Sequence, residues 1–571
     1  MKIEAETPLR SGPKEGTPAR DFNMVVLLAC LLTCMTLRLH LALTYEVNWD
    51  EFLNLSMVYD YLRGDLQEPL QTLFVHAFRW APAVSTNEVD QIVAARVVMF
   101  ACTAATTVCI VAVARRFMSW HAAMFAAFCF AAYSFTVRQG GSFRTDTMAA
   151  CVLMAALWII VARPRGTAWP ILAGGLIGLA GMLTIKAIFY VPTIAAILLL
   201  ALAGSGPARR PLRYGMIVAG TSMGTFALLF WLHAWSLDDP ASAFSFLDRT
   251  TGKTLGLDDT VVLVRYLGAA VLYNPVVWIA LVSGVLACLW RLWTGPRRVE
   301  AATLLSLGLP LLSLAVYSES YPYYHSFILA PAAVLCGAFL SRLNAAKASR
   351  LAVMGTLAVS IQFGVTYAGL LERDNRTQHL TLAVVHRMFA EPVPYIDRSS
   401  MVSSFPKTGF FLSDWGMLDY YREGEPLIAR AIATDQPPFV LANRHMLEWQ
   451  NLVPDRAGPA FLGLMRADIE ALRAHYIPHW GWIYVAGKSF DDMAVGQARS
   501  FDIMVEGTYT IEAPGPVWLN GDVRHPGSHV TLDAGRHELR ATVPGTVILR
   551  WGADLYRPRF PPPKAGLFTT F

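Results

Sequence analysis

Apolar runs of about 20 residues recur along the chain, and they constrain its fold more than any other feature. They are separated by short charged breaks and continue as far as residue 371. Each run is long enough to cross the hydrocarbon core of a bilayer as a helix. Of the 571 residues, 54% are hydrophobic and only 16% are charged, which is too apolar for a soluble protein. The sequence therefore predicts a polytopic α-helical membrane protein.

We expect about 11 spans, within a range of roughly 9–13, because several runs are short or share a tight turn. Basic residues concentrate in the tail before residue 24 and in alternate breaks near 115, 164, 210, 297 and 347. By the positive-inside rule these segments are cytoplasmic, so the remaining loops face outward. The expected spans are 24–44, 91–113, 121–137, 146–162, 168–184, 188–204, 214–236, 263–290, 299–317, 325–341 and 350–371.

The membrane part is predicted to begin after a polar cytoplasmic tail at 1–23 and to occupy 24–371. Its first outer loop, 45–90, carries two amphipathic helical patterns, one on each side of Gly64. Such helices are expected to lie along the membrane surface. They could serve only as surface anchors, or they could form the wall of a lipid-facing cleft.

The remainder of the chain is predicted to form two outer-face domains. Residues 372–500 combine buried-strand patterns with a helical one at 468–475, which indicates a small α/β domain. From 501 to 571 the apolar period becomes two, with turn signals at Asn520-Gly521 and Ala534-Gly535. This pattern predicts a β-sandwich-like domain.

Two adjacent carboxylates, Asp50 and Glu51, follow the first apolar run. A carboxylate at the membrane boundary is costly unless it is solvated, paired with a cation or used in chemistry. The predicted topology brings other polar side chains, from three further outer loops, to the same face. These are Arg138, Arg144, Asp146, Lys186, Glu319, Tyr324 and His325.

This combination of side chains suits one reaction. Guanidinium and ammonium groups bind phosphate oxygens, and a carboxylate can remove a proton from an attacking hydroxyl. We therefore expect transfer of a sugar from a polyprenyl phosphate in the bilayer to a hydroxyl presented from outside. No metal is required for a monophosphate leaving group, although Asp50 and Glu51 could hold a divalent ion. Nucleic acid is not an expected partner, because the basic residues lie in loops between spans.

Four short motifs in the membrane part resemble a known family. Trp49-Asp50-Glu51, followed by a helical loop, is similar to the Asp-Glu signature of the GT-C membrane glycosyltransferases. Within these, the sequence is most similar to the branch of protein O-mannosyltransferases and lipid A aminoarabinose transferases. The other similar motifs are Phe143-Arg144-Thr145-Asp146-Thr147-Met148, Gly178 to Lys186, and Tyr323-Tyr324-His325 followed by Pro331.

The resemblance covers roughly 24–371 and implies a polyprenyl-phosphate-sugar-dependent glycosyltransferase that inverts the anomeric centre. It implies that Asp50 is the base and that Arg144 and Lys186 contact the lipid phosphate. Ile185 and Ala187, which flank Lys186, depart from the Thr-Lys-Gly pattern of that branch. Further roles follow from expected sidedness alone. Glu51 would position the acceptor or Asp50, Arg138 and His325 would join the phosphate site, and Asp146, Glu319 and Tyr324 would bind substrate.

Each assignment has a structural alternative. Lys186 could extend from a span end to the interface, Arg144 and Asp146 could form a local ion pair, and His325 could start a helix. Arg38 and His40 could touch a lipid headgroup, although anchoring of the span is favoured.

Two other functions stay open at this stage, a transporter or flippase of an amphipathic lipid or glycolipid and a glycan-binding assembly subunit. The expected partners are a polyprenyl-phosphate sugar, membrane lipid and an acceptor glycan, lipid or protein. The expected location is a bacterial inner membrane, with the active site and the C-terminal domains in the periplasm; an endoplasmic reticulum enzyme facing the lumen would obey the same charge rule.

Overall fold

The computed structural model describes residues 21–164, 166–204, 209–237, 260–295, 297–317 and 319–569. The predicted cytoplasmic tail therefore lies almost entirely outside the described residues. The chain folds as two compact units. Unit 1 contains the chain up to Tyr45, Asp60–Arg79 and Val93–Arg373, and unit 2 contains Glu46–Tyr59, Trp80–Ile92 and Asp374–Phe571.

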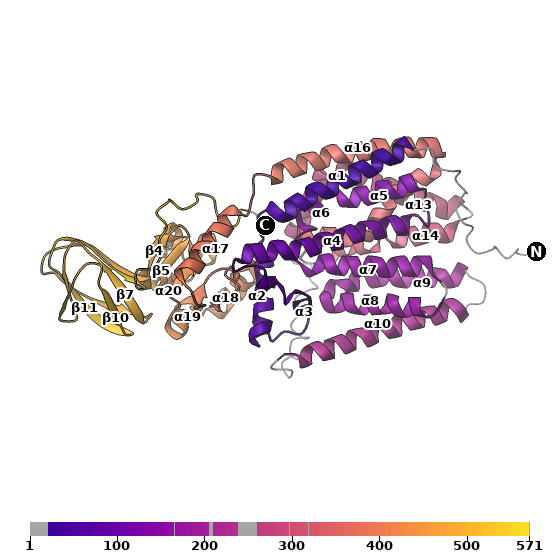
Figure 1. Ribbon diagram of the computed structural model, residues 1–571. Coiled ribbons are helices and arrows are strands. Elements are labelled where there is room, and N and C mark those ends of the chain that lie inside the picture. Colours follow the sequence, from indigo (N-terminus) through magenta and orange to yellow (C-terminus); the bar gives the residue numbers. More distant parts are fainter. Residues whose placement is uncertain are drawn as a thin grey trace, which may run out of the picture. The chain divides into compact units, whose positions relative to one another are not determined.

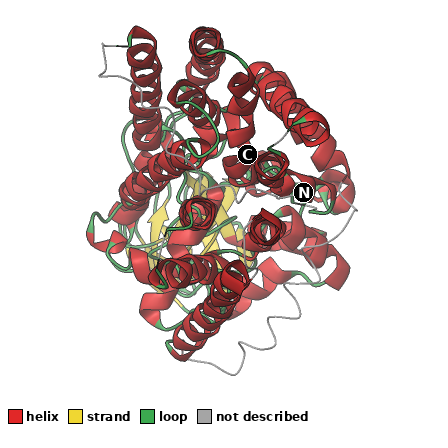
Figure 2. Cartoon of the chain, turned by 90° about the vertical axis from the view of Figure 1, so that its right-hand side faces the viewer, coloured by secondary structure: helices red, strands yellow, loops and turns green. Residues whose placement is uncertain are grey.

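Unit 1 is a bundle of helices that lie side by side (Figures 1 and 2). Helices α2 and α4 each contribute residues to both units. The helices are α1 (Phe22–Thr44), α2 (Trp49–Arg63), α3 (Val75–Phe78), α4 (Glu88–Ala114), α5 (Trp120–Ala131), α6 (Ser134–Gln139), α7 (Thr145–Ala162), α8 (Ala168–Leu183), η2 (Ile185–Tyr190), α9 (Val191–Gly204), α10 (Arg209–Trp235), α12 (Thr260–Tyr273), α13 (Pro275–Thr294), α14 (Arg298–Ser306), η3 (Leu309–Ala315), α15 (Pro322–Ala332), η4 (Ala333–Arg342) and α16 (Ala345–Leu370).

Within the described residues, eight helices are long and apolar enough to cross a membrane. The number becomes nine if α14 and η3, which meet at a 42° bend, form one span. Three more apolar helices are shorter, namely α5, α8 and the Val264–Tyr273 part of α12. The expected run 263–290 is two helices, because α12 ends at Tyr273 and Pro275 opens α13. The predicted polytopic helical fold is confirmed, and the span count stays a prediction.

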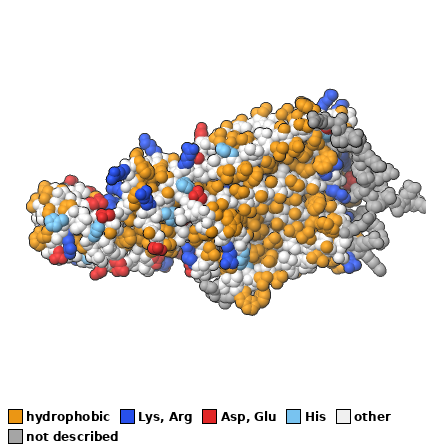
Figure 3. Space-filling model, in the orientation of Figure 1, with side chains coloured by type: hydrophobic (Ala, Val, Ile, Leu, Met, Phe, Trp, Pro, Cys, Tyr) orange, Lys and Arg blue, Asp and Glu red, His pale blue; other side chains and the backbone are white. Residues whose placement is uncertain are grey.

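Hydrophobic side chains cover the surface of the helical bundle (Figure 3). Helix α10 is the clearest case, since only 6% of its most apolar window is buried inside the structure. Leu228, Trp231 and Trp235 of this helix are each more than half exposed. An apolar face of this extent is stable in lipid and not in water. The chain is an integral membrane protein.

Helices α8 and α10 pack so closely that glycine is required at their interface. A Cβ on Gly174 would lie 1.8 Å from Thr221 Oγ1, and one on Gly178 would lie 2.5 Å from the Ser222 carbonyl oxygen. Small residues four apart let helix backbones approach in this way. The contact fixes the end of α8, from which the chain turns directly into η2.

The predicted span 121–137 is interrupted between α5 and α6. Arg38 of α1 donates to the carbonyl oxygens of Ala131 (3.2 Å) and Thr136 (2.9 Å) beside this break. The backbone N–H of Ser134 donates to Asn274 Oδ1 at 2.7 Å. Polar side chains thus satisfy backbone groups that a continuous helix would pair internally, as an interrupted helix within a membrane requires.

Unit 2 contains two β-sheets and several helices in addition to the start of α2. Its 3₁₀ turns are η1 (Ala81–Ala83), η5 (His445–Leu447), η6 (Trp449–Asn451), η7 (Pro454–Arg456) and η8 (Pro459–Phe461). The other elements are α17 (Arg376–Met388), β1 (Tyr395–Ile396), β2 (Lys407–Thr408), α18 (Asp414–Glu423), α19 (Leu427–Asp435), β3 (Phe439–Leu441), α20 (Arg466–His475), β4 (Tyr476–Trp480), β5 (Ile483–Met493), β6 (Ala498–Ile503), β7 (Gly507–Glu512), β8 (Val517–Leu519), β9 (Asp522–Arg524), β10 (His529–Leu532), β11 (Gly535–Ala541) and β12 (Gly545–Trp551).

The long strand β5 belongs to both the predicted α/β region and the predicted sandwich region of unit 2. In the eight-stranded sheet the order is β10-β7-β12-β5-β3-β1-β2, with β4 also on β5. Strand β1 is parallel to β2 and β3, and the other pairs are antiparallel. The start of β5 pairs with β3 and its later residues pair with β12. The predicted α/β and sandwich regions therefore share one strand.

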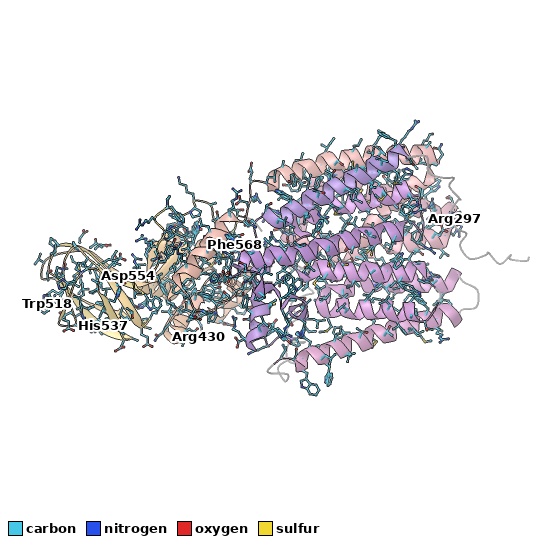
Figure 4. The ribbon with its side chains drawn as sticks, viewed as in Figure 1. Arg297, Arg430, Trp518, His537, Asp554 and Phe568 are labelled. Carbon is cyan, nitrogen blue, oxygen red and sulfur yellow. The ribbon has the colours of Figure 1, made fainter. Side chains whose placement is uncertain are left out.

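A second sheet, β6-β11-β8-β9, completes the sandwich. Trp518 on β8 and His537 on β11 are labelled in Figure 4. Asn520 and Gly521 connect β8 to β9 with φ of 51° and 91°. Such a two-residue turn, with positive φ at both positions, is the one that the Asn-Gly signal favours in hairpins. The C-terminal β domain is confirmed.

Candidate functional site

In unit 1, the start of α7 and the turn after α8 bring Arg144, Asp146 and Lys186 together. Arg144 is the N-cap of α7 and has an extended backbone, with φ −138° and ψ 144°. Asp146 lies in the first helical turn, where the helix dipole favours a carboxylate. Thr184 caps η2 by accepting a hydrogen bond from the Lys186 N–H. This cap holds the backbone of Lys186 at the turn.

Asp146 is the centre of this ionic cluster. Its Oδ1 lies 2.8 Å from Lys186 Nζ, and its Oδ2 lies 3.6 Å from Arg144 Nε. Lys186 is only 9% exposed, so its side chain does not extend to the surface. The two cations share this carboxylate in a poorly solvated place, where charges interact strongly.

Tyr323 of α15 provides a face for both cations. The Arg144 Cζ lies 3.6 Å from the ring centroid of Tyr323, and Lys186 Nζ lies 4.5 Å from it. Both distances are within the range of cation–π attraction. The ring and Asp146 together fix the positions of the two cations.

A cleft opens beside this cluster. Arg144, Asp146 and Tyr323 line it on one side, and Thr103 and Gln139 are among the polar residues on the others. A small anionic group entering the cleft would meet the Arg144 guanidinium. The arrangement can bind an oxyanion and can stabilise negative charge that increases on it.

The three other residues predicted near α15 are Tyr324, His325 and Glu319, and within the described chain none of their side chains forms a hydrogen bond or ion pair with the ionic cluster around Asp146. Tyr324 is fully buried, and its hydroxyl bonds Ser313. His325 is 3% exposed and packs edge-on against Phe135. Glu319 is half-buried, and within the described residues it forms no side-chain ion pair.

Arg138 lies in a neighbouring cleft and not in the one lined by Arg144. Its Nε donates to the Tyr45 hydroxyl at 3.2 Å. The chain between α6 and α7 contributes lining residues to both clefts.

Asp50 and Glu51 belong to unit 2, where they occupy the first turn of α2. The Asn48 side chain accepts from the Asp50 N–H at 3.0 Å, and Glu51 Oε1 accepts from the Asn48 N–H at 3.0 Å. These reciprocal bonds form a capping box. Glu51 is fully buried, whereas Asp50 is half-buried. The predicted proximity of Asp50 to Arg144 and Lys186 stays a prediction.

Trp49, the neighbour of Asp50, is held within unit 2 by aromatic and cationic groups. The Arg398 Cζ lies 3.6 Å from the Trp49 ring centroid, and Phe568 packs edge-on against the same ring. Among the residues that the structure describes, no group of three or more His, Cys, Asp or Glu could hold a metal ion.

Tyr323 is the residue that reasoning from the sequence missed, because Tyr324 is expected to bind substrate. Both tyrosines follow Pro322 at the start of α15. Successive residues on a helix point about 100° apart, so only one of them can face a given cleft. The sequence signal, two adjacent tyrosines, does not say which one.

Comparison with known proteins agrees with this architecture. Residues 78–233 match the sequence profile of a family described as dolichyl-phosphate-mannose-protein mannosyltransferase. Comparison with curated protein sequences gave no match.

Several solved structures are similar in fold. ArnT from Cupriavidus metallidurans bound to undecaprenyl phosphate has 14% identity and a TM-score of 0.51, and the match covers 73% of this chain and 92% of ArnT. The apo form of the same protein gives 12% identity, a TM-score of 0.52 and the same coverage. The apo oligosaccharyltransferase of Archaeoglobus fulgidus gives 12% identity and a TM-score of 0.50, covering 90% of this chain and 76% of that one. At these identities the structures show a shared fold.

The resemblance seen in the sequence motifs is confirmed by the family match and by the fold. Over residues 78–233 the chain matches this mannosyltransferase family, and it shares its fold with ArnT and the archaeal oligosaccharyltransferase.

Proposed function

We propose that this glycosyltransferase moves a sugar from a polyprenyl-phosphate donor to a hydroxyl acceptor on the outer face of the membrane, with inversion. The observation that carries the proposal is the cluster of Arg144, Lys186 and Tyr323 around Asp146. It is a fixed cationic site in the membrane unit, beside a cleft that Arg144 lines. ArnT, which is similar in fold, has been solved with undecaprenyl phosphate bound.

In this proposal Arg144 and Lys186 bind the donor phosphate. The phosphodiester of the donor carries one negative charge, and the monophosphate that leaves carries up to two. Cations that are fixed before the reaction stabilise the charge that develops on the leaving group. Asp146 holds both of them in place.

Asp50 acts as the base in the same step. The acceptor oxygen forms a bond to the anomeric carbon as the bond from that carbon to the phosphate oxygen breaks. The acceptor proton passes to Asp50, and the electron pair of the broken bond stays on the phosphate. One such displacement inverts the anomeric centre. Glu51 supports Asp50 through the capping box at the start of α2.

The charge pattern of the loops supports an active face on the side away from the cytoplasm, which is the periplasm if the membrane is a bacterial inner membrane. The acceptor is a glycan, a lipid or a protein that presents a hydroxyl there. The mechanism requires no metal cofactor.

Two measurements on purified protein test this function. Binding of undecaprenyl phosphate, with undecaprenol as the uncharged control ligand, should fall roughly tenfold or more in Arg144→Met. Asp50→Asn should keep this binding. It should abolish release of undecaprenyl phosphate from undecaprenyl-phosphate sugars, supplied one sugar at a time with membranes as the acceptor source. Full turnover by Asp50→Asn would contradict its role as base, and unchanged binding by Arg144→Met would contradict the phosphate site.

A further inference from the structure

Residues 552–569, here called the strap, are the last described part of unit 2 and form no helix or strand. The strap leaves the end of β12 and passes β4. There His479 Nε2 lies 2.9 Å from the Tyr556 carbonyl oxygen. The Trp480 indole N–H donates to the Phe560 carbonyl oxygen at 3.1 Å. The sheet therefore fixes the course of the strap, which ends at the first residues of α2.

The end of the strap holds the chain just before α2. The Thr569 N–H donates to Glu46 Oε1 at 2.7 Å, and the Thr569 hydroxyl donates to Glu46 Oε2. These two residues lie 523 positions apart in the sequence. Glu46 is only 6% exposed, and a buried carboxylate requires donors of this kind.

Gln378 of α17 joins the strap to the residue that follows Glu46. Its side-chain amide accepts from the Val47 N–H and donates to the carbonyl oxygens of Val47 and Leu567, each at 2.8 Å. Gln378 and Leu567 are both buried. A buried amide that satisfies three backbone groups at once connects the two segments firmly, because loss of any bond leaves a polar group unpaired.

The ring of Phe568 covers the first turn of α2. It packs edge-on against Trp49 and Phe52, with ring centroids 6.0 Å apart in both pairs (Figure 4). Trp49 and Phe52 are three positions apart and share one face of the helix, and Asp50 lies between them in the sequence. The first N–H groups of a helix lack intrahelical partners, so this turn frays unless other contacts hold it.

We propose that Leu567, Phe568 and Thr569 are positioning residues for Asp50. They hold the chain on both sides of this carboxylate, although they come from the other end of the described sequence. The inference rests on the proposed role of Asp50 as the base. A misplacement of about 1 Å can lower a rate roughly a hundredfold, so loss of the strap contacts reduces turnover even when Asp50 is intact.

Hydrogen exchange of the purified full-length chain tests the positioning directly. The amides of Asn48, Asp50 and Glu51 are hydrogen-bonded at the start of α2 and report its opening. Thr569→Val removes the hydroxyl donor, and Phe568→Leu removes the ring. Each variant should raise the exchange rates of these amides roughly tenfold. Unchanged exchange in both variants would overturn the inference.

Turnover tests whether this positioning serves the reaction. The readout is release of undecaprenyl phosphate from the undecaprenyl-phosphate sugar that the wild type uses. The maximal rate should fall roughly tenfold or more in Thr569→Val and Phe568→Leu. The apparent KM for the donor should stay within about twofold, because the proposed phosphate site lies in unit 1. Thr569→Ser keeps the hydroxyl donor and should restore both the rate and the slow exchange.

Phe560→Leu is the matched control, since Phe560 lies in the same strap and its ring packs against Trp480 of β4. It should change neither the exchange at 48–52 nor the maximal rate. Equal effects of Phe560→Leu would show a general loss of stability and overturn the positioning role. Faster exchange with an unchanged maximal rate in the Thr569 and Phe568 variants would overturn it as well.

Failure of the proposed function gives a different result. A wild-type protein that releases undecaprenyl phosphate from none of the sugars contradicts the proposed function. The exchange rates at 48–52 then still decide whether the strap holds the segment that carries Asp50.

Discussion

The ammonium of Lys186 lies 2.8 Å from Asp146 Oδ1, and both side chains are buried. Asp146 lies at the start of α7, and Lys186 follows the end of α8, 40 positions later in the sequence. A buried ion pair of this kind is maintained only while both partners are present, because loss of one leaves an uncompensated charge.

Lys186→Met should therefore reduce both ligand binding and stability. We expect undecaprenyl phosphate binding to fall roughly tenfold to a hundredfold, and the thermal midpoint of unfolding to drop. Adding Asp146→Asn removes the stranded carboxylate. The double variant should recover much of the stability without recovering the binding. Recovered binding in the double variant would show that Lys186 serves only to neutralise Asp146.

Tyr323 should act through its ring and not through its hydroxyl. Tyr323→Phe keeps the aromatic face under Arg144 and Lys186 and should bind undecaprenyl phosphate within about twofold of the wild type. Tyr323→Leu removes that face and should weaken binding roughly 5- to 30-fold, as expected for loss of about 1–2 kcal/mol of cation–π attraction. Equilibrium binding distinguishes the two variants. A large loss in Tyr323→Phe would instead assign the role to the hydroxyl.

Glu51 should tolerate glutamine better than alanine. Gln can also accept the Asn48 N–H of the capping box, so Glu51→Gln should keep most of the transfer activity. Glu51→Ala loses the cap and should destabilise the start of α2 by about 1 kcal/mol. The two variants are compared by transfer rate and by thermal unfolding. If Glu51→Gln is inactive but stable, the charge of Glu51 takes part in the reaction.

Lys407 predicts a pH dependence of stability in unit 2. Burial lowers the pKa of Lys407 from 10.5 to about 8, while the charge of Asp397 opposes this shift. Between about pH 8 and 10.5 the unfolded chain therefore binds more protons at this site than the folded chain. The contribution of Lys407 to stability must then rise with pH across that window.

Lys407→Met removes this titration and keeps every other titratable group, so the variant shows how stability depends on pH without Lys407. The wild-type unfolding midpoint minus that of the variant should increase between pH 7.5 and 9.5. The expected change is a few degrees, since about 1 kcal/mol shifts the midpoint of a domain of this size by roughly 2–4 °C. A difference that is constant or falls with pH would contradict the lowered pKa.

The fold follows from the sequence where one signal dominates. Long apolar runs can only be membrane helices, and the Asn520-Gly521 hairpin forms because few other dipeptides tolerate positive φ at both positions. Helix interruptions are harder to predict. The break between α5 and α6 depends on Arg38 and Asn274, which are distant in sequence and satisfy the exposed backbone groups.

In the candidate site, too, some features can be predicted from the sequence and others depend on residues that are distant in the chain. Arg144 and Lys186 can be selected from the sequence because the predicted topology places both at outer span ends, within motifs that resemble a known family. Their shared partner Asp146 and the Tyr323 ring depend on helix rotation, which composition does not determine. The capping box of Asn48 and Glu51, by contrast, can be recognised in the sequence from its spacing of three. In that pattern Glu51 supports the helix start.

Because strand β5 is shared, the α/β and sandwich regions of unit 2 cannot be separated by truncating the chain between them. Its start completes the sheet with β3, and its later residues pair with β12. A chain shortened after residue 500 would keep β5 but lose β12, leaving the edge of β5 between Gly487 and Met493 without its partner strand. Open edges of this kind recruit other chains and lead to aggregation. Soluble versions of the tail should therefore extend past Trp551, so that β12 is retained.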